Sequence, residues 1–85
     1  GNIDLGVGDN EDVYSRTQAE MILKDFFLKN TPTNFTIIHK GESTMNVVYR
    51  IGILKTKEGK SYRITFNMKK INEQFQIHQM QIEEN

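Results

Sequence analysis

Hydrophobic residues change from a helical to a strand-like spacing at Pro32, and that change decides the fold class of this chain. Between Ser15 and Pro32 they recur every three or four residues, the repeat that places side chains on one face of a helix. The residues with this repeat are Ala19, Ile22, Leu23, Phe26 and Phe27. After Pro32 they alternate with polar residues, as in half-buried strands. The chain is therefore expected to be an α+β domain, with one helix packed on a curved antiparallel sheet.

The helix has start and stop signals in the sequence. Ser15 and Gln18 have the spacing of a capping box, in which each side chain accepts a hydrogen bond from the other residue's backbone N–H. At the other end, Pro32 disfavours helical backbone at Thr31. A helix of roughly 14 residues is predicted between these signals.

Strands are predicted on both sides of the helix. Residues Asn2 to Gly8 alternate apolar and polar side chains, and Gly8 to Asp12 then form a polar turn. Beyond Asn34 the alternation continues through roughly four strands, which are expected to form an antiparallel meander. The turns of this meander are expected at Lys40–Thr44, Glu58-Gly59 and Asn72-Glu73.

The turn at Glu58-Gly59 predicts which side chains face the helix. A two-residue turn brings the apolar residues of the two flanking strands to one face, the inner face. The expected pairs are Ile53 with Ile64, Ile51 with Phe66 and Tyr49 with Met68.

In the last strand the alternation breaks, which predicts an irregularity. Continuing the register beyond Ile77 would turn glutamines inward and apolar residues outward. One extra residue near His78-Gln79, a β-bulge, would return Met80 and Ile82 to the inner face. The pairs then expected are Met68 with Ile77, Phe66 with Met80 and Ile64 with Ile82.

One helix is too small to cover such a sheet. It is ~21 Å long and ~10 Å wide, whereas five strands at ~4.8 Å spacing make a sheet ~24 Å across. About half of the inner face is therefore left uncovered. The uncovered half is expected to be a ligand cavity, a dimer contact, or a surface covered by residues that this chain lacks.

Composition excludes several classes of function. Eleven Lys and Arg balance eleven Asp and Glu, so the basic excess typical of nucleic-acid binders is missing. The chain has no cysteine, and no apolar run approaches the ~20 residues of a membrane span. No carboxylate is predicted on the inner face, where burial would raise its pKa into a useful range. We therefore expect no enzyme, no cofactor and no metal site.

Four segments resemble a family of small uncharacterised proteins exported by Bacteroidetes. They are Tyr14–Glu20, Asp25–Phe27, Phe35–Gly41 and Tyr49–Thr56. The fold of that family looks like the nuclear-transport-factor-2-like (cystatin-like) superfamily, a curved sheet wrapping helices. The resemblance implies a single domain over residues 1–85, an exported or periplasmic location, and helices that normally precede the first strand and are absent here. It assigns no catalytic residue.

Four polar side chains are candidates for lining a pocket on the inner face. By strand parity they are His39, Tyr49, Tyr62 and Gln79. A ligand could be oriented by the tyrosine hydroxyls and by the imidazole of His39. The same tyrosines could equally cap the core at its solvent-exposed ends, and His39 could be a partly exposed histidine at a strand end.

The other face of the sheet offers two weaker candidates. His78, with Asn67 and Arg50 across neighbouring strands, could form an anion-binding row or simply a solvated polar face. Because the two histidines are predicted on opposite faces, a shared metal site is not expected. Three aliphatic residues break the polar alternation there and could form a partner surface: Ile38, Val48 and Leu54.

Two functions remain open at this point. The preferred one is a non-catalytic interaction or ligand-binding module that uses its uncovered sheet to form a homodimer or to bind a protein partner or small apolar ligand. The alternative is a small-molecule pocket protein or enzyme of the same superfamily, with His39, Tyr49 and Tyr62 around the ligand.

Overall fold

One helix and six strands make up the structure, a computed structural model of residues 1–85. In chain order the elements are β1 (Asn2–Val7), β2 (Asn10–Ser15), α1 (Arg16–Lys29), β3 (Pro32–Thr44), β4 (Val47–Thr56), β5 (Ser61–Ile71) and β6 (Gln74–Glu84). The predicted α+β class is confirmed.

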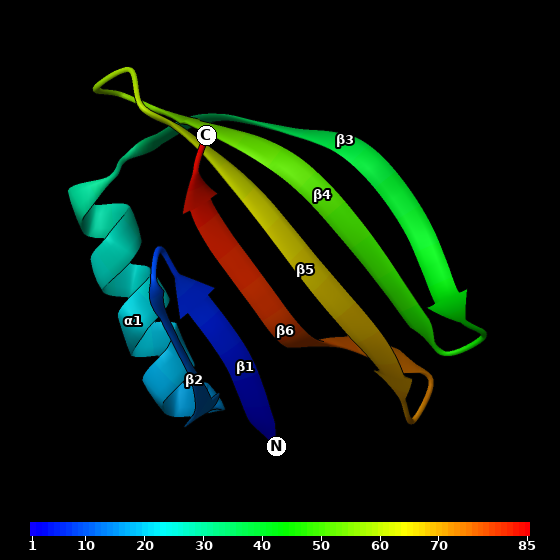
Figure 1. Ribbon diagram of the computed structural model, residues 1–85. Coiled ribbons are helices and arrows are strands. Elements are labelled where there is room, and N and C mark those ends of the chain that lie inside the picture. Colours follow the sequence, from blue (N-terminus) through cyan, green and yellow to red (C-terminus); the bar gives the residue numbers. More distant parts are fainter.

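All six strands belong to one sheet, in the order β2-β1-β6-β5-β4-β3 (Figure 1). Strands β3 to β6 form the predicted antiparallel meander. The N-terminal strand β1 joins the meander by pairing with β6 in parallel. The two outer strands, β2 and β3, are therefore the edges of the sheet.

Strand β2 was not predicted, because the polar segment that contains it was expected to be only a turn. The turn is limited to Gly8 and Asp9, and Gly8 has a positive φ of 63°. The chain then pairs with β1 over the whole length of β2. Only Tyr14 of β2 packs against the core, and the other side chains of the strand are exposed. Such an edge strand has no apolar alternation to reveal it.

Helix α1 begins and ends as the sequence predicts. Ser15 is the N-cap, and both hydrogen bonds of the capping box with Gln18 are present. Asn30 is the C-cap, and its side-chain amide donates to the carbonyl of Phe26 at 3.0 Å. The chain then enters β3 directly at Pro32.

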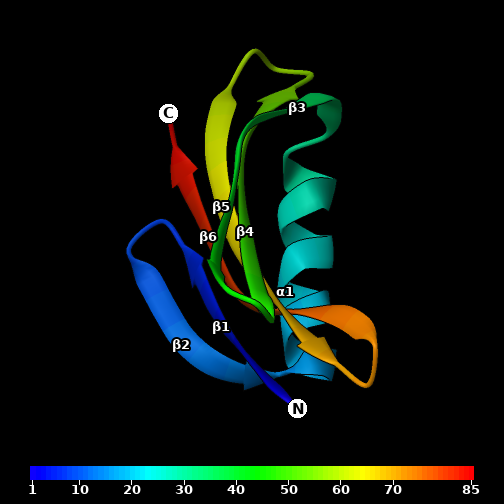
Figure 2. The same cartoon turned by 90° about the vertical axis from the view of Figure 1, so that its right-hand side faces the viewer.

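The core lies between α1 and one face of the sheet, which we name the helix face; the opposite side is the far face (Figure 2). Leu5 and Ile82 are the most buried large side chains, each 1% exposed. The buried residues contributed by the meander are Leu54, Tyr62, Ile64 and Ile82, and Ile3, Leu5 and Ala19 form a second cluster.

Helix α1 covers only part of the helix face. Its 14 residues span about 21 Å, whereas the longest dimension of the molecule is 39 Å. The helix lies beside β1 and β2, and β3, β4 and β5 arch away from it (Figure 1). Phe35, Ile37 and Phe75 remain exposed on the uncovered part of the helix face.

The bulge predicted in β6 is present. Met68 pairs with Ile77 and Phe66 pairs with Met80, so His78 is the extra residue between the two registers. The shift returns Met80 and Ile82 to the helix face, where both contact the core. These pairs confirm the predicted position of the bulge. The position was predictable because burial on one face of a strand strongly specifies its register.

The predicted register between β4 and β5 is wrong by one residue. Lys55 pairs with Ser61, so three residues rather than two form the turn: Lys57, Glu58 and Gly59. The N–H of Thr56 donates to the carbonyl of Lys60 at 3.0 Å, and Gly59 has a φ of 83°. Three-residue hairpin turns commonly end with such a left-handed residue.

This single residue exchanges the two faces of β4. Gly52 lies opposite Ile64 and Leu54 lies opposite Tyr62, so the even-numbered residues face the helix. Tyr49, Ile51 and Ile53 consequently lie on the far face. A one-residue slip must exchange every side chain of a strand, since the side-chain period of a strand is two.

Candidate functional site

The four residues predicted to line a pocket do not come together. Tyr62 is the only one of them on the helix face, where it is buried. Its hydroxyl donates to the side-chain oxygen of Asn30 at 2.9 Å, and its ring meets Phe26 edge-on at 5.1 Å. Tyr62 therefore links β5 to the end of α1, which is the core-capping role weighed above.

His39 and Tyr49 lie on the far face and contact each other there. The Nε2 atom of His39 is 3.2 Å from the Tyr49 hydroxyl, and the ring centroids are 5.5 Å apart. The Tyr49 ring covers Gly41 so closely that a Cβ on Gly41 would collide with it. Two causes place the pair here: the shifted β4 register and a bulge at Ile38, which turns His39 away from the helix.

Gln79 also lies on the far face, in a separate contact. Its side-chain oxygen accepts a hydrogen bond from Asn67 at 2.7 Å. The predicted anion row is not formed, because Arg50 pairs with Phe66 on the helix face. The Nδ1 atom of His78, the bulge residue, is buried without a hydrogen-bond partner.

The predicted partner surface is also corrected by the β4 register. Val48 and Leu54 are 8% and 4% exposed, and Leu54 belongs to the core. Only Ile38, at the bulge in β3, is exposed as predicted. The three aliphatic residues therefore do not form one surface.

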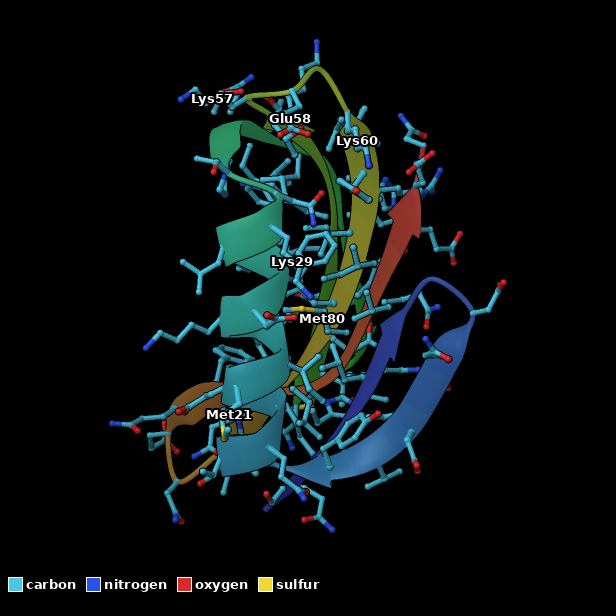
Figure 3. The ribbon with its side chains drawn as sticks, turned by 90° about the vertical axis from the view of Figure 1, so that its left-hand side faces the viewer. Met21, Lys29, Lys57, Glu58, Lys60 and Met80 are labelled. Carbon is cyan, nitrogen blue, oxygen red and sulfur yellow. The ribbon has the colours of Figure 1, made fainter.

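An apolar groove on the helix face is the site that the structure supports best. Its volume is about 280 Å³, close to the lower end of the range for ligand pockets, ~300–1,000 Å³. Phe27 and Pro32 line it at the end of α1, and the sheet contributes Phe35, Leu54, Ile64, Phe66, Ile77 and Met80. No lining residue is polar or charged. Figure 3 shows Met80 between α1 and the sheet, whereas Met21 lies on the outer side of the helix.

A glycine shapes the edge of this groove. The Phe35 ring of β3 lies across Gly52 of β4, and a Cβ on Gly52 would collide with it. Glycine thus lets the ring lie flat against the backbone of the neighbouring strand. Sequence reasoning predicted the uncovered face but not this lining, because the register predicted for β4 placed Gly52 and Leu54 on the far face. The available signal was the pair Pro32 and Phe35, which directly follows the helix.

A larger cleft, of about 580 Å³, separates the β1–β2 hairpin from α1. Its rim carries Asp9, Glu11 and Asp12 on the hairpin side and Asp25 on the helix side. Asp25 is paired with Lys29 at 3.0 Å across an exposed surface. Apolar residues line the rest of the cleft, among them Leu5, Ile22 and Phe26, so its walls are mixed, with acidic residues at the rim.

Neither a metal site nor a membrane-spanning helix is formed by these side chains. No group of three or more His, Asp or Glu side chains is placed to hold a metal ion. Helix α1 is neither long enough nor apolar enough to cross a membrane.

Three crystal structures of Bacteroides proteins share this fold, each with a TM-score of 0.91. The proteins come from Bacteroides ovatus (26% identity), Bacteroides fragilis (25%) and Bacteroides uniformis (24%). The alignments cover 99% of this chain but 74%, 77% and 76% of those chains, respectively. About a quarter of each relative thus lies outside the aligned region. No curated protein matches the chain.

All three crystallised proteins are described as DUF4783 family proteins. The model of that family, a domain of unknown function, matches residues 1–83 of this sequence. A match of that length covers the helix, strands β1 to β5, and β6 except for its last residue. The chain therefore belongs to the DUF4783 family.

Proposed function

We propose that this domain is a non-catalytic binding module that holds an apolar ligand or partner in the groove between α1 and the arched part of the sheet. The observation that carries the proposal is the lining of the groove, which is entirely apolar and open to solvent. Burying such a surface gains roughly 25 cal/mol per Å². A soluble chain that leaves it exposed gives up this free energy unless something binds there.

The chemistry of the groove supports binding rather than catalysis. None of its lining residues has an ionisable side chain, and a general acid or base must reach the reacting atom through a hydrogen bond. The alternative enzyme required His39, Tyr49 and Tyr62 around one ligand. Tyr62 lies on the opposite face from the other two, which weighs against that alternative.

The wider setting is part of the same proposal. A curved sheet with a helix packed on one face is what the resemblance to the nuclear-transport-factor-2-like superfamily implies, and we assign the domain to that fold. An exported or periplasmic location follows from the same resemblance. Cell fractionation with an antibody against the domain tests the location independently of binding.

Native mass spectrometry of the purified protein is the first test of binding. A monomer that retains an adduct supports a ligand groove, and a dimer without added mass supports a second copy as the occupant. A monomer without any adduct is then titrated with decan-1-ol as a neutral apolar probe. The readout is the NMR signals of the methionine methyl groups.

These methyl groups locate the probe. Met80 lines the groove, whereas Met45 and Met21 are 93% and 67% exposed outside it. We expect decanol to shift the Met80 signal and to leave those of Met21 and Met45 unchanged. Phe35→Glu should weaken binding at least about tenfold. Its matched control is Ile38→Glu, on the same strand outside the groove. Equal loss in both variants, or no Met80 shift, contradicts the proposal.

A further inference from the structure

Two positively charged side chains lie beside the apolar groove on the helix face. Arg50 of β4 lies directly opposite Phe66, a lining residue of the groove. Lys40 of β3 lies directly opposite Arg50 on its other side. Side chains opposite each other on neighbouring strands have Cβ atoms about 5 Å apart, so both cations are within reach of the same point at the groove's end.

Neither cation has an anionic partner in the chain. The ion pairs that form join Lys29 to Asp25 and Lys70 to Glu73. The guanidinium of Arg50 donates only to the neighbouring carbonyl of Tyr49, at 2.9 Å.

The nearest carboxylate along β3 does not neutralise the pair. It belongs to Glu42, which lies opposite Val48, one register step beyond Lys40 and Arg50, and it forms no ion pair. Like charges directly opposite each other destabilise a sheet. An anion between Lys40 and Arg50 would remove that repulsion.

We propose that the occupant of the groove is an anionic amphiphile, a medium- or long-chain carboxylate. Its alkyl chain lies along Phe35, Phe66 and Met80, and its carboxylate lies between Arg50 and Lys40. A guanidinium binds a carboxylate through two parallel hydrogen bonds, which fixes the head group as well as attracting it. This inference rests on the proposed function and adds to it the chemical class of the ligand.

The test compares two probes that differ only in charge. Decanoate and decan-1-ol are titrated separately into the protein, and the Met80 methyl signal reports binding of each. We expect the protein to bind decanoate about tenfold more tightly than decanol. In Arg50→Gln the affinity for decanoate should fall about tenfold, the affinity for decanol should stay unchanged, and Arg50→Lys should restore part of the loss.

Arg63→Gln is the matched control. Arg63 lies on the neighbouring strand β5 and faces the far side, opposite Ile53. Its replacement removes one positive charge without touching the groove, so decanoate affinity should stay within about twofold of that of the unchanged protein. Circular dichroism of each variant verifies that it is folded.

The outcomes separate the two proposals. Equal binding of decanoate and decanol overturns the anionic ligand and leaves the apolar groove standing. Binding of neither probe overturns both. Equal weakening by Arg50→Gln and Arg63→Gln shows a general charge effect and overturns the role of Arg50. A dimer that excludes both probes makes a second copy the occupant and likewise overturns the carboxylate.

Discussion

The two halves of the helix face contain similar apolar residues, which are buried in one half and partly exposed to solvent in the other. In the half beneath α1, Leu5 and Ile82 are almost completely buried. In the half beneath the arch of β3 to β5, Phe35 and Phe75 are 43% and 49% exposed. The difference comes from the length of one helix and not from composition. The covered half stabilises the fold, and the open half is free to bind.

The covered half is also the more closely connected. There the Tyr62 hydroxyl links the sheet to the helix C-cap, and Arg16 at the start of α1 donates to the carbonyl of Ile77 at 2.8 Å. In the open half, the cations Lys40 and Arg50 have no partner of opposite charge. Substitutions should therefore act mainly on stability in one half and mainly on binding in the other.

The largest expected effect is on the covered half. Leu5→Ala should lower the free energy of unfolding by about 3 kcal/mol, since it removes a fully buried side chain and leaves a cavity. Phe75→Ala, in the open half, should cost at most about 1 kcal/mol, because half of its ring is already in water. Urea denaturation of both variants measures the difference. Equal losses would show that the two halves do not differ in packing.

A smaller effect is expected from a hydroxyl in the covered half. Tyr62→Phe should cost about 1 kcal/mol, because it removes a hydrogen bond to Asn30 from a largely buried position. The control is Tyr49→Phe, which removes an exposed hydroxyl contact with His39 on the far face and should leave stability nearly unchanged. Thermal unfolding of the pair checks this, and a larger loss from Tyr49→Phe would contradict it.

The smallest effect has the opposite sign and lies in the open half. Lys40→Gln should raise the free energy of unfolding by about 0.3 kcal/mol at low salt, because it relieves repulsion from Arg50. The gain should vanish at about 1 M salt, where exposed charges are screened beyond ~3 Å. The control is Lys55→Gln, because Lys55 of β4 is equally exposed but lies opposite the uncharged Asn34 of β3. A salt-independent gain would show that repulsion is not its cause.

Within the meander, the sequence pattern predicted the register of β6 but not that of β4, for a physical reason. The bulge at His78 could be predicted because Met80 and Ile82 must return to a buried face, which leaves one acceptable register. The register of β4 could not, because its residues are apolar on both faces: Ile51 and Ile53 alternate with Gly52 and Leu54. Burial then does not distinguish the two registers of β4. The length of the turn before Ser61 decides which of them forms.

The prediction of the candidate site depended on the same uncertain register of β4. Adding one residue to the turn moved Tyr49 to the far face and Arg50 to the helix face. The bulge at Ile38 moved His39 in the same direction, and nothing in an exposed edge strand marks such a bulge. The uncovered area itself was predictable, because it follows from the dimensions of one helix and a sheet.

The parallel pairing of β1 with β6 has a consequence for folding during synthesis on the ribosome. The N–H of Gly8 donates to the carbonyl of Ile82 at 2.9 Å, so β1 is held in place by a strand that is made more than 60 residues later. On the ribosome, β1 and α1 are made before β6, and their apolar faces lack its side chains until β6 has emerged. Such distant pairings slow folding. Between the synthesis of β1 and that of β6, the nascent chain is therefore open to aggregation or to chaperones.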